Sequence, residues 1–169
     1  MKTREGGRKM SRKPKSAAEL AASSGMHSVS PHLVCRGAAD AIAFYERAFG
    51  ATKMMVLPGP DGKIMHGCVS INGSSVMLVD ENPEYGLKSP KLLGGSPVTM
   101  HLIVDDVDVA TDKALAAGAT VVMPVADMFW GDRYGVVEDP FGHRWSIATP
   151  TREPMTEAEL RDAAKSAFA

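Results

Sequence analysis

The sequence predicts an α+β fold built from two tandem βαβββ modules, because the order of strand and helix patterns repeats and two short landmarks recur at nearly the same offset. His32-Leu33-Val34 opens the first unit, and His101-Leu102-Ile103 opens the second, 69 positions later. Gly50-Ala51-Thr52 follows the first expected helix, and Gly118-Ala119-Thr120 follows the second, 68 positions later. Because the order of elements also matches, a duplicated unit explains the landmarks better than chance similarity does.

The first module has one helix and four strands. Ile42, Tyr45 and Phe49 fall on one helical stripe, and Gly50 then supplies the residue that a helix end favours. Asn72-Gly73 is a strong hairpin signal between the last two strands. The expected elements are a strand at Val29–Arg36, a helix at Ala38–Phe49, and strands at Thr52–Leu57, Lys63–Ile71 and Ser75–Asp80.

The second module repeats this order. Ala110, Ala114 and Leu115 mark the buried side of its helix, and Asp139-Pro140-Phe141-Gly142 is a tight turn between its last strands. The expected elements are a strand at Val98–Val104, a helix at Val107–Ala117, and strands at Thr120–Val125, Arg133–Glu138 and His143–Ala148.

Two further segments flank the folded region. Thr156 and Glu159 form a capping box for a last helix at Glu157–Phe168, and a short helix is allowed at Ser16–Ala22. The expected organisation is a basic, disordered extension (1–26), a folded domain (27–150) with module one at 28–80, a linker at 81–97 and module two at 98–150, and a C-terminal helix (151–169).

Composition points to a soluble globular protein, with 44% apolar and 23% charged residues. No apolar run approaches the roughly 20 residues of a membrane span, so no membrane association is expected. Cys35 and Cys68 form no CxxC motif or disulfide framework, and a cytoplasmic location with reduced thiols is the default expectation. Cys35 shares the face of Leu33 and is expected in the core.

The extension is basic, with seven Lys or Arg residues against two Glu in residues 1–26. Such an arm suits either a solvated tail or association with DNA. No aromatic residue is interleaved with the charges, so nucleic-acid binding is not expected. Salt-sensitive DNA retention that is lost on deletion of residues 1–26 would support the DNA alternative.

Four segments resemble the glyoxalase/bleomycin-resistance/dioxygenase (vicinal oxygen chelate) superfamily, over roughly residues 28–150. They are Ala41–Ala51 in the first helix, Val104–Asp108 before the second, and Phe129–Gly135 with Asp139–Ser146, which are similar to its PhnB-like branch. The resemblance implies two modules side by side that form an open curved barrel around a cavity, and a homodimer. It also implies either small-molecule binding or metal-dependent lyase, isomerase or dioxygenase chemistry.

Family members with a metal hold it on inward-facing His, Glu or Gln side chains. Alignment through the helix starts places these positions on Ser30, Thr99, Ser146 and Leu78, none of which is a good ligand for a divalent ion. The chain therefore lacks the standard metal ligands that the resemblance implies.

Other side chains offer substitutes. His32 and His101 lie two residues after the lost positions and so share their strand face, and His66 has Tyr134 as its counterpart. These histidines could ligate a divalent Zn, Ni, Fe or Mn ion, with Glu138 as the catalytic proton carrier. Hydrogen-bonded structural histidines in a metal-free polar cavity are the alternative.

The loop before the seventh strand offers ligand contacts. Trp130 could stack a flat ligand and Arg133 could grip a carboxylate or phosphonate, unless the aromatic residues are core or dimer contacts and Asp132 pairs with Arg133 or Arg144. His143 is expected at the surface or capping its turn, and His27 in the tail. The methionines in or beside strands are expected to fill the module cores rather than to line a cavity.

Two functions follow. The first is a small-molecule-binding protein whose ligand contacts His32, His66, His101, Trp130, Arg133 and Tyr134. The second is a metal-dependent lyase, isomerase or dioxygenase that uses the three histidines and Glu138.

Overall fold

The computed structural model describes residues 15–168. The predicted disordered extension falls outside the described residues before Lys15, and its remainder contains a helix with a capping box between Ser16 and Glu19. The elements are α1 (Ala17–Ser23), β1 (His32–Cys35), α2 (Ala38–Phe49), β2 (Thr52–Pro58), β3 (Ile64–Ile71), β4 (Ser74–Asp80), η1 (Pro83–Tyr85), α3 (Pro90–Leu93), β5 (Thr99–Ile103), α4 (Val107–Ala117), β6 (Thr120–Asp127), β7 (Asp132–Glu138), β8 (Arg144–Pro150) and α5 (Glu157–Ala167).

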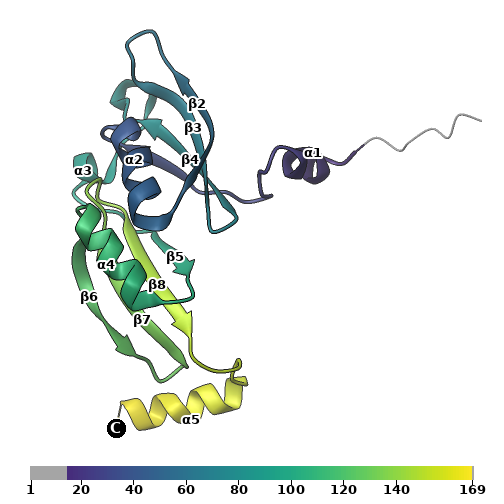
Figure 1. Ribbon diagram of the computed structural model, residues 1–169, viewed down its shortest axis with the longest axis vertical. Coiled ribbons are helices and arrows are strands. Elements are labelled where there is room, and N and C mark those ends of the chain that lie inside the picture. Colours follow the sequence, from purple (N-terminus) through teal and green to yellow (C-terminus); the bar gives the residue numbers. More distant parts are fainter. Residues whose placement is uncertain (1–14, 169) are drawn as a thin grey trace, which may run out of the picture.

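The two predicted modules are confirmed, each as a four-stranded sheet with one long helix (Figure 1). The strand orders are β1-β4-β3-β2 and β5-β8-β7-β6, so the second sheet repeats the first. In each sheet the opening strand is parallel to the closing strand, and the other neighbours are antiparallel. Over the described residues, the two sheets stay separate and neither closes into a barrel.

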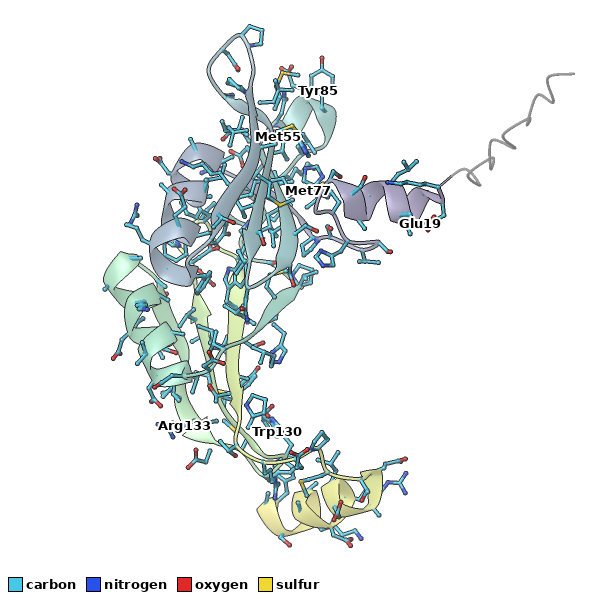
Figure 2. All side chains as sticks on the ribbon, turned by 45° about the vertical axis from the view of Figure 1, so that its right-hand side comes forward. Glu19, Met55, Met77, Tyr85, Trp130 and Arg133 are labelled. Carbon is cyan, nitrogen blue, oxygen red and sulfur yellow. The ribbon has the colours of Figure 1, made fainter. Side chains whose placement is uncertain are left out.

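Each long helix covers one face of its own sheet, and α2 and α4 also contact each other. Gly67 lies on the covered face of the first sheet, since a Cβ added there would come within 3.2 Å of the Ile42 side chain. Because strand side chains alternate, His66 and Cys68 lie on the opposite face. We call the sheet faces opposite α2 and α4 the open faces (Figure 2).

A buried polar network joins the two modules on the helix-covered side of the sheets. Asp139 is 2% exposed and accepts hydrogen bonds from the Tyr45 hydroxyl at 2.7 Å and from the Trp145 indole at 3.1 Å. Its other oxygen accepts from the amides of Phe141 and His143, each at 2.9 Å. Since Tyr45 belongs to α2 and the other residues to module two, this carboxylate fixes one module against the other.

The two long helices begin differently. Asp106 caps α4 locally by accepting from the Val109 amide, as sequence rules favour. Gly37 precedes α2 and offers no side-chain cap. Asp80 at the end of β4 replaces it, accepting from the Gly37 and Ala38 amides at 3.0 and 2.9 Å. A cap from another strand ties the helix start to the sheet.

Some boundaries differ from the sequence expectations. The expected linker at 81–97 contains two short helical turns, η1 and α3, because Pro83 and Pro90 occupy first-turn positions that favour a helix start. β6 extends to Asp127 and α5 ends at Ala167. Within the described part of the chain, no helix is long and apolar enough to cross a membrane.

Candidate functional site

A row of three rings lies on the open face of module two. The Trp130 and Tyr134 ring centroids are 5.6 Å apart with an edge-to-face geometry, and those of Tyr134 and His101 are 6.3 Å apart and stacked. His101 Nδ1 lies 2.8 Å from Ser146 Oγ on the neighbouring strand, because β5 and β8 pair these two residues directly. We call Trp130, Tyr134 and His101 the aromatic row.

The loop that carries Trp130 is held by the C-terminal segment. The Trp130 indole donates to Asp132 at 3.0 Å, and Arg152 donates to the Phe129 carbonyl at 2.7 Å. The Phe129 ring meets the Trp130 ring at 5.0 Å and the Phe168 ring, just after α5, at 5.7 Å. Because these contacts fix the loop at one end of the aromatic row, Trp130 is a positioned rather than a free side chain.

The open face of module one carries two of the predicted histidines. The His32 and His66 rings are 6.3 Å apart and nearly perpendicular. Partial burial lowers the pKa of His32, and the neighbouring His66 lowers it further. A neutral His32 imidazole at physiological pH is the physical consequence, able both to accept and to donate a hydrogen bond.

The structure corrects one position in the comparison of the two modules. Ser146 pairs with His101 in module two, and its equivalent opposite His32 is Met77. Leu78, which alignment through the helix starts places there, is fully buried and faces the helix. A shift of one residue reverses the face of a strand side chain, so the aligned position was wrong by one.

The three histidines do not form a metal site in one chain. His32 and His66 lie together on module one, and His101 belongs to module two beside Ser146. Among residues 15–168, no group of three or more His, Cys, Asp or Glu side chains is placed to hold a metal ion. Within one chain, the described donors therefore do not complete a site for the divalent ion that the family resemblance implies.

Arg133 lies apart from the aromatic row. Its guanidinium makes a paired contact with Asp108 of α4, at 2.6 and 2.8 Å, and a third with Asp127 at 3.1 Å. The hydrogen bonds from Arg133 lower the pKa of the Asp108 carboxyl. Figure 2 shows Arg133 and Trp130 on opposite sides of the sheet. The structure thus brings Trp130 and Tyr134 together and leaves Arg133 on the helix side.

Glu138 shares the open face of module two with Tyr134 but lies toward the other end of the strand. Its nearest opposite charge is Arg144, the residue paired with it on β8, at 3.8 Å. His32 and His66 are on the other module, so the chain does not join Glu138 to them as an acid–base pair.

A pocket between the modules includes a histidine that sequence analysis left in the tail. His27 Nδ1 lies 3.0 Å from Ser75 Oγ, which also accepts from the His27 amide at 3.0 Å. This pocket has a volume of ≈ 400 Å³ and brings His27 and His101 to one hollow, with Ser75, Met100 and Trp145 also in its wall. A larger hollow of ≈ 610 Å³ between α2 and α4 includes none of the predicted site residues. No motif marks His27, since its partner is 48 positions away.

His143 was expected at the surface or capping its turn, and the structure shows that it is buried. Its Nε2 lies 3.2 Å from the Val34 carbonyl and 3.7 Å from Cys35 Sγ, across the module boundary. Burial lowers the pKa of His143, against the opposing effect of the Asp139 charge. The expectation failed because the turn after β7 packs against module one. Cys35 lies in the core, as predicted.

Comparison with known protein families identifies the family of this chain. The sequence profile of the Glyoxalase/Bleomycin resistance protein/Dioxygenase superfamily matches residues 25–147, which is more than half of the chain. The protein belongs to this superfamily.

The chain is also similar to individual proteins, among them the following three. Rv0887c of Mycobacterium tuberculosis is 56% identical over 128 residues, which are 74% of this chain and 75% of that protein. The crystal structure of the Arabidopsis thaliana gene product AT5G48480 is 30% identical, with a TM-score of 0.61 over 73% of this chain and 98% of that one. The PhnB protein from Bacillus cereus shares the fold, at 17% identity and a TM-score of 0.58, over 73% and 99% of the two chains.

Proposed function

We propose that this protein binds a flat small molecule on the open face of module two. The aromatic row is the observation that supports the proposal, because its three rings and its polar end lie on the open face and are not part of the hydrophobic core. Trp130 and Tyr134 would contact the apolar faces of the ligand, and His101, oriented by the buried Ser146, would bind a polar group.

The hydrogen bonds of Ser146 set which ring nitrogen of His101 can accept from a ligand. The Ser146 hydroxyl also reaches the Met100 carbonyl, at 3.4 Å. A hydroxyl that donates to this carbonyl accepts from His101 Nδ1–H, which leaves Nε2 as an acceptor toward the ligand. A ligand with an O–H or N–H donor at its edge is therefore the favoured chemistry.

A second copy of the chain would close the site. β2 and β6 each form one of the two edges of their sheet, and both expose apolar side chains, including Met55, Leu57, Val121 and Met123. Exposed apolar edge strands favour association. We propose a homodimer, with a mass near twice 18.0 kDa by light scattering. A monomer at every concentration tested would contradict it.

The metal-dependent alternative stays a prediction. It rests on the His32–His66 pair, which would need at least one further ligand from a partner chain. A cytoplasmic location likewise remains an expectation from the sequence.

The test uses anilinonaphthalene sulfonate, a fluorescent aromatic probe whose anilino N–H can donate a hydrogen bond to His101 Nε2. Trp130→Ala is expected to weaken probe binding by about tenfold, which corresponds to about 1.4 kcal/mol. His101→Ala is expected to weaken it as well. Arg133→Ala is the matched control, since Arg133 is on β7 next to Tyr134 but lies on the helix side of the sheet, and it should leave the affinity within about twofold. Equal loss in Arg133→Ala, or no loss in Trp130→Ala, would contradict the proposal.

A further inference from the structure

Three sulfur atoms meet beside β3, outside the aromatic row. Cys68 Sγ lies 3.4 Å from Met26 Sδ and 3.6 Å from Met54 Sδ. The Cys68 residue is only 2% exposed. We call Cys68, Met26 and Met54 the sulfur cluster. Neither the core of module one nor the proposed ligand row accounts for the convergence of these three side chains.

Each side chain of the sulfur cluster comes from a different segment of the chain. Cys68 is on the open face of β3, and Met54 comes from β2 at a register shift between Lys53 and Met55. Met26 lies in the segment between α1 and β1. Three separate segments thus supply one sulfur each.

The segment carrying Met26 is fixed over the cluster. Its next residue, His27, donates its amide to Ser75 on β4 at 3.0 Å, and Ser30 Oγ lies 2.5 Å from the same hydroxyl. Gly25 has φ +76°, and a Cβ there would lie 2.6 Å from Met54 Cε. The left-handed backbone conformation favours glycine here, and it brings the segment against the Met54 side chain at the cluster.

The chemistry of the donors is selective. Thiolate and thioether sulfur are soft ligands that favour Cu(I) and similar ions over hard divalent cations. Methionine has three rotatable bonds, so small rotations can move both thioethers around a central ion. Burial raises the pKa of Cys68, so the free protein holds a thiol.

We propose that the sulfur cluster binds one soft monovalent metal ion, Cu(I) or Ag(I), through Cys68 Sγ and the Sδ atoms of Met26 and Met54. Binding replaces the thiol proton: the S–H bond breaks, the Cys68 thiolate and the two thioether sulfurs each bond to the ion, and one proton leaves to solvent, with no change in oxidation state. The two thioethers rotate about their side-chain bonds to admit the ion beneath the segment that carries Met26. This site is independent of the aromatic row.

The test is a titration of the full chain with Ag(I), which needs no reductant. Calorimetry gives the stoichiometry, and the ¹³C shifts of the methionine ε-methyl groups locate the ion. We expect one Ag(I) per chain, with the Met26 and Met54 methyl signals shifted. Cys68→Ser should remove this binding, and Met26→Leu/Met54→Leu should weaken it at least tenfold.

Met65→Leu/Met155→Leu is the matched control, because it removes two methionines outside β2 and β6 and keeps the sulfur cluster. It should bind Ag(I) as the wild type does. Leucine conserves side-chain volume, and circular dichroism checks that each variant is folded. Wild-type affinity in Met26→Leu/Met54→Leu would reduce the site to a lone thiol and overturn the proposal. So would equal binding by Cys68→Ser and the wild type.

Discussion

Replacing Tyr45 with Phe should destabilise the protein by uncoupling the two modules. The change deletes the hydroxyl that donates to Asp139 at 2.7 Å and keeps the ring. Burial raises the pKa of Tyr45 well above its usual value, and the Asp139 charge adds to the effect, so the hydroxyl remains a protonated donor. A buried hydrogen bond to a charged group contributes about 1.5–3 kcal/mol. We expect Tyr45→Phe to lower the free energy of unfolding by that amount.

The assay is urea unfolding followed by tryptophan fluorescence. For a chain of this size, each kcal/mol corresponds to a shift in Tm of about 2–4 °C. Asp139→Ala should cost more, because it leaves the Tyr45 hydroxyl, the Trp145 indole and two amides without their acceptor. The double variant Tyr45→Phe/Asp139→Ala should cost less than the sum of the two.

The control is Tyr85→Phe, which removes a hydroxyl from a tyrosine that is 81% exposed. It should change the free energy of unfolding by less than about 0.5 kcal/mol. If Tyr45→Phe is as stable as Tyr85→Phe, the hydrogen bond to Asp139 does not hold the modules together.

Two other predictions concern stability. Asp80→Ala removes the cap of α2 and should cost about 1–3 kcal/mol in urea unfolding, whereas Asp80→Asn should cost less; equal stability of Asp80→Ala and the wild type would contradict the cap. Burial lowers the pKa of His143, so the unfolded chain binds its proton more readily. This contribution to stability is complete above the unfolded pKa of about 6.5 and is lost as the pH falls toward the lowered native pKa. Between pH 7 and 5, unfolding curves of His143→Gln should therefore show a weaker loss of stability than the wild type, and parallel pH profiles would refute it.

The sequence was sufficient for the fold wherever local patterns decide structure. Helix Ala38–Phe49 and helix Val107–Ala117 have the predicted bounds, because an apolar stripe and a terminal glycine mark each. The strand period of two also predicted that His66 and Cys68 share a face.

Features that depend on distant partners could not be predicted in this way. The acceptor for the start of α2 is Asp80, more than 40 positions away, and the partner of Arg133 is Asp108, 25 positions away. His143 is buried only because its turn meets the other module. Nothing local in the sequence marks these long-range contacts.

The candidate site could be predicted from the sequence only in part. Strand periodicity put His101 on the face of the lost ligand position, and the repeat made Tyr134 the counterpart of His66. An alignment error of one residue chose Leu78 instead of Met77 opposite His32. The sulfur cluster was missed because Met26 lies in a segment that looked like a solvated tail.

The most direct test of the ligand site follows the two tryptophan indole N–H signals by ¹⁵N–¹H NMR. Trp130 is in the aromatic row, and Trp145 is buried with its N–H bonded to Asp139. On titration with anilinonaphthalene sulfonate, we predict a saturable shift of the Trp130 indole signal and no shift of the Trp145 signal. A bound probe that shifts neither signal, or that shifts only Trp145, would contradict ligand binding at the aromatic row.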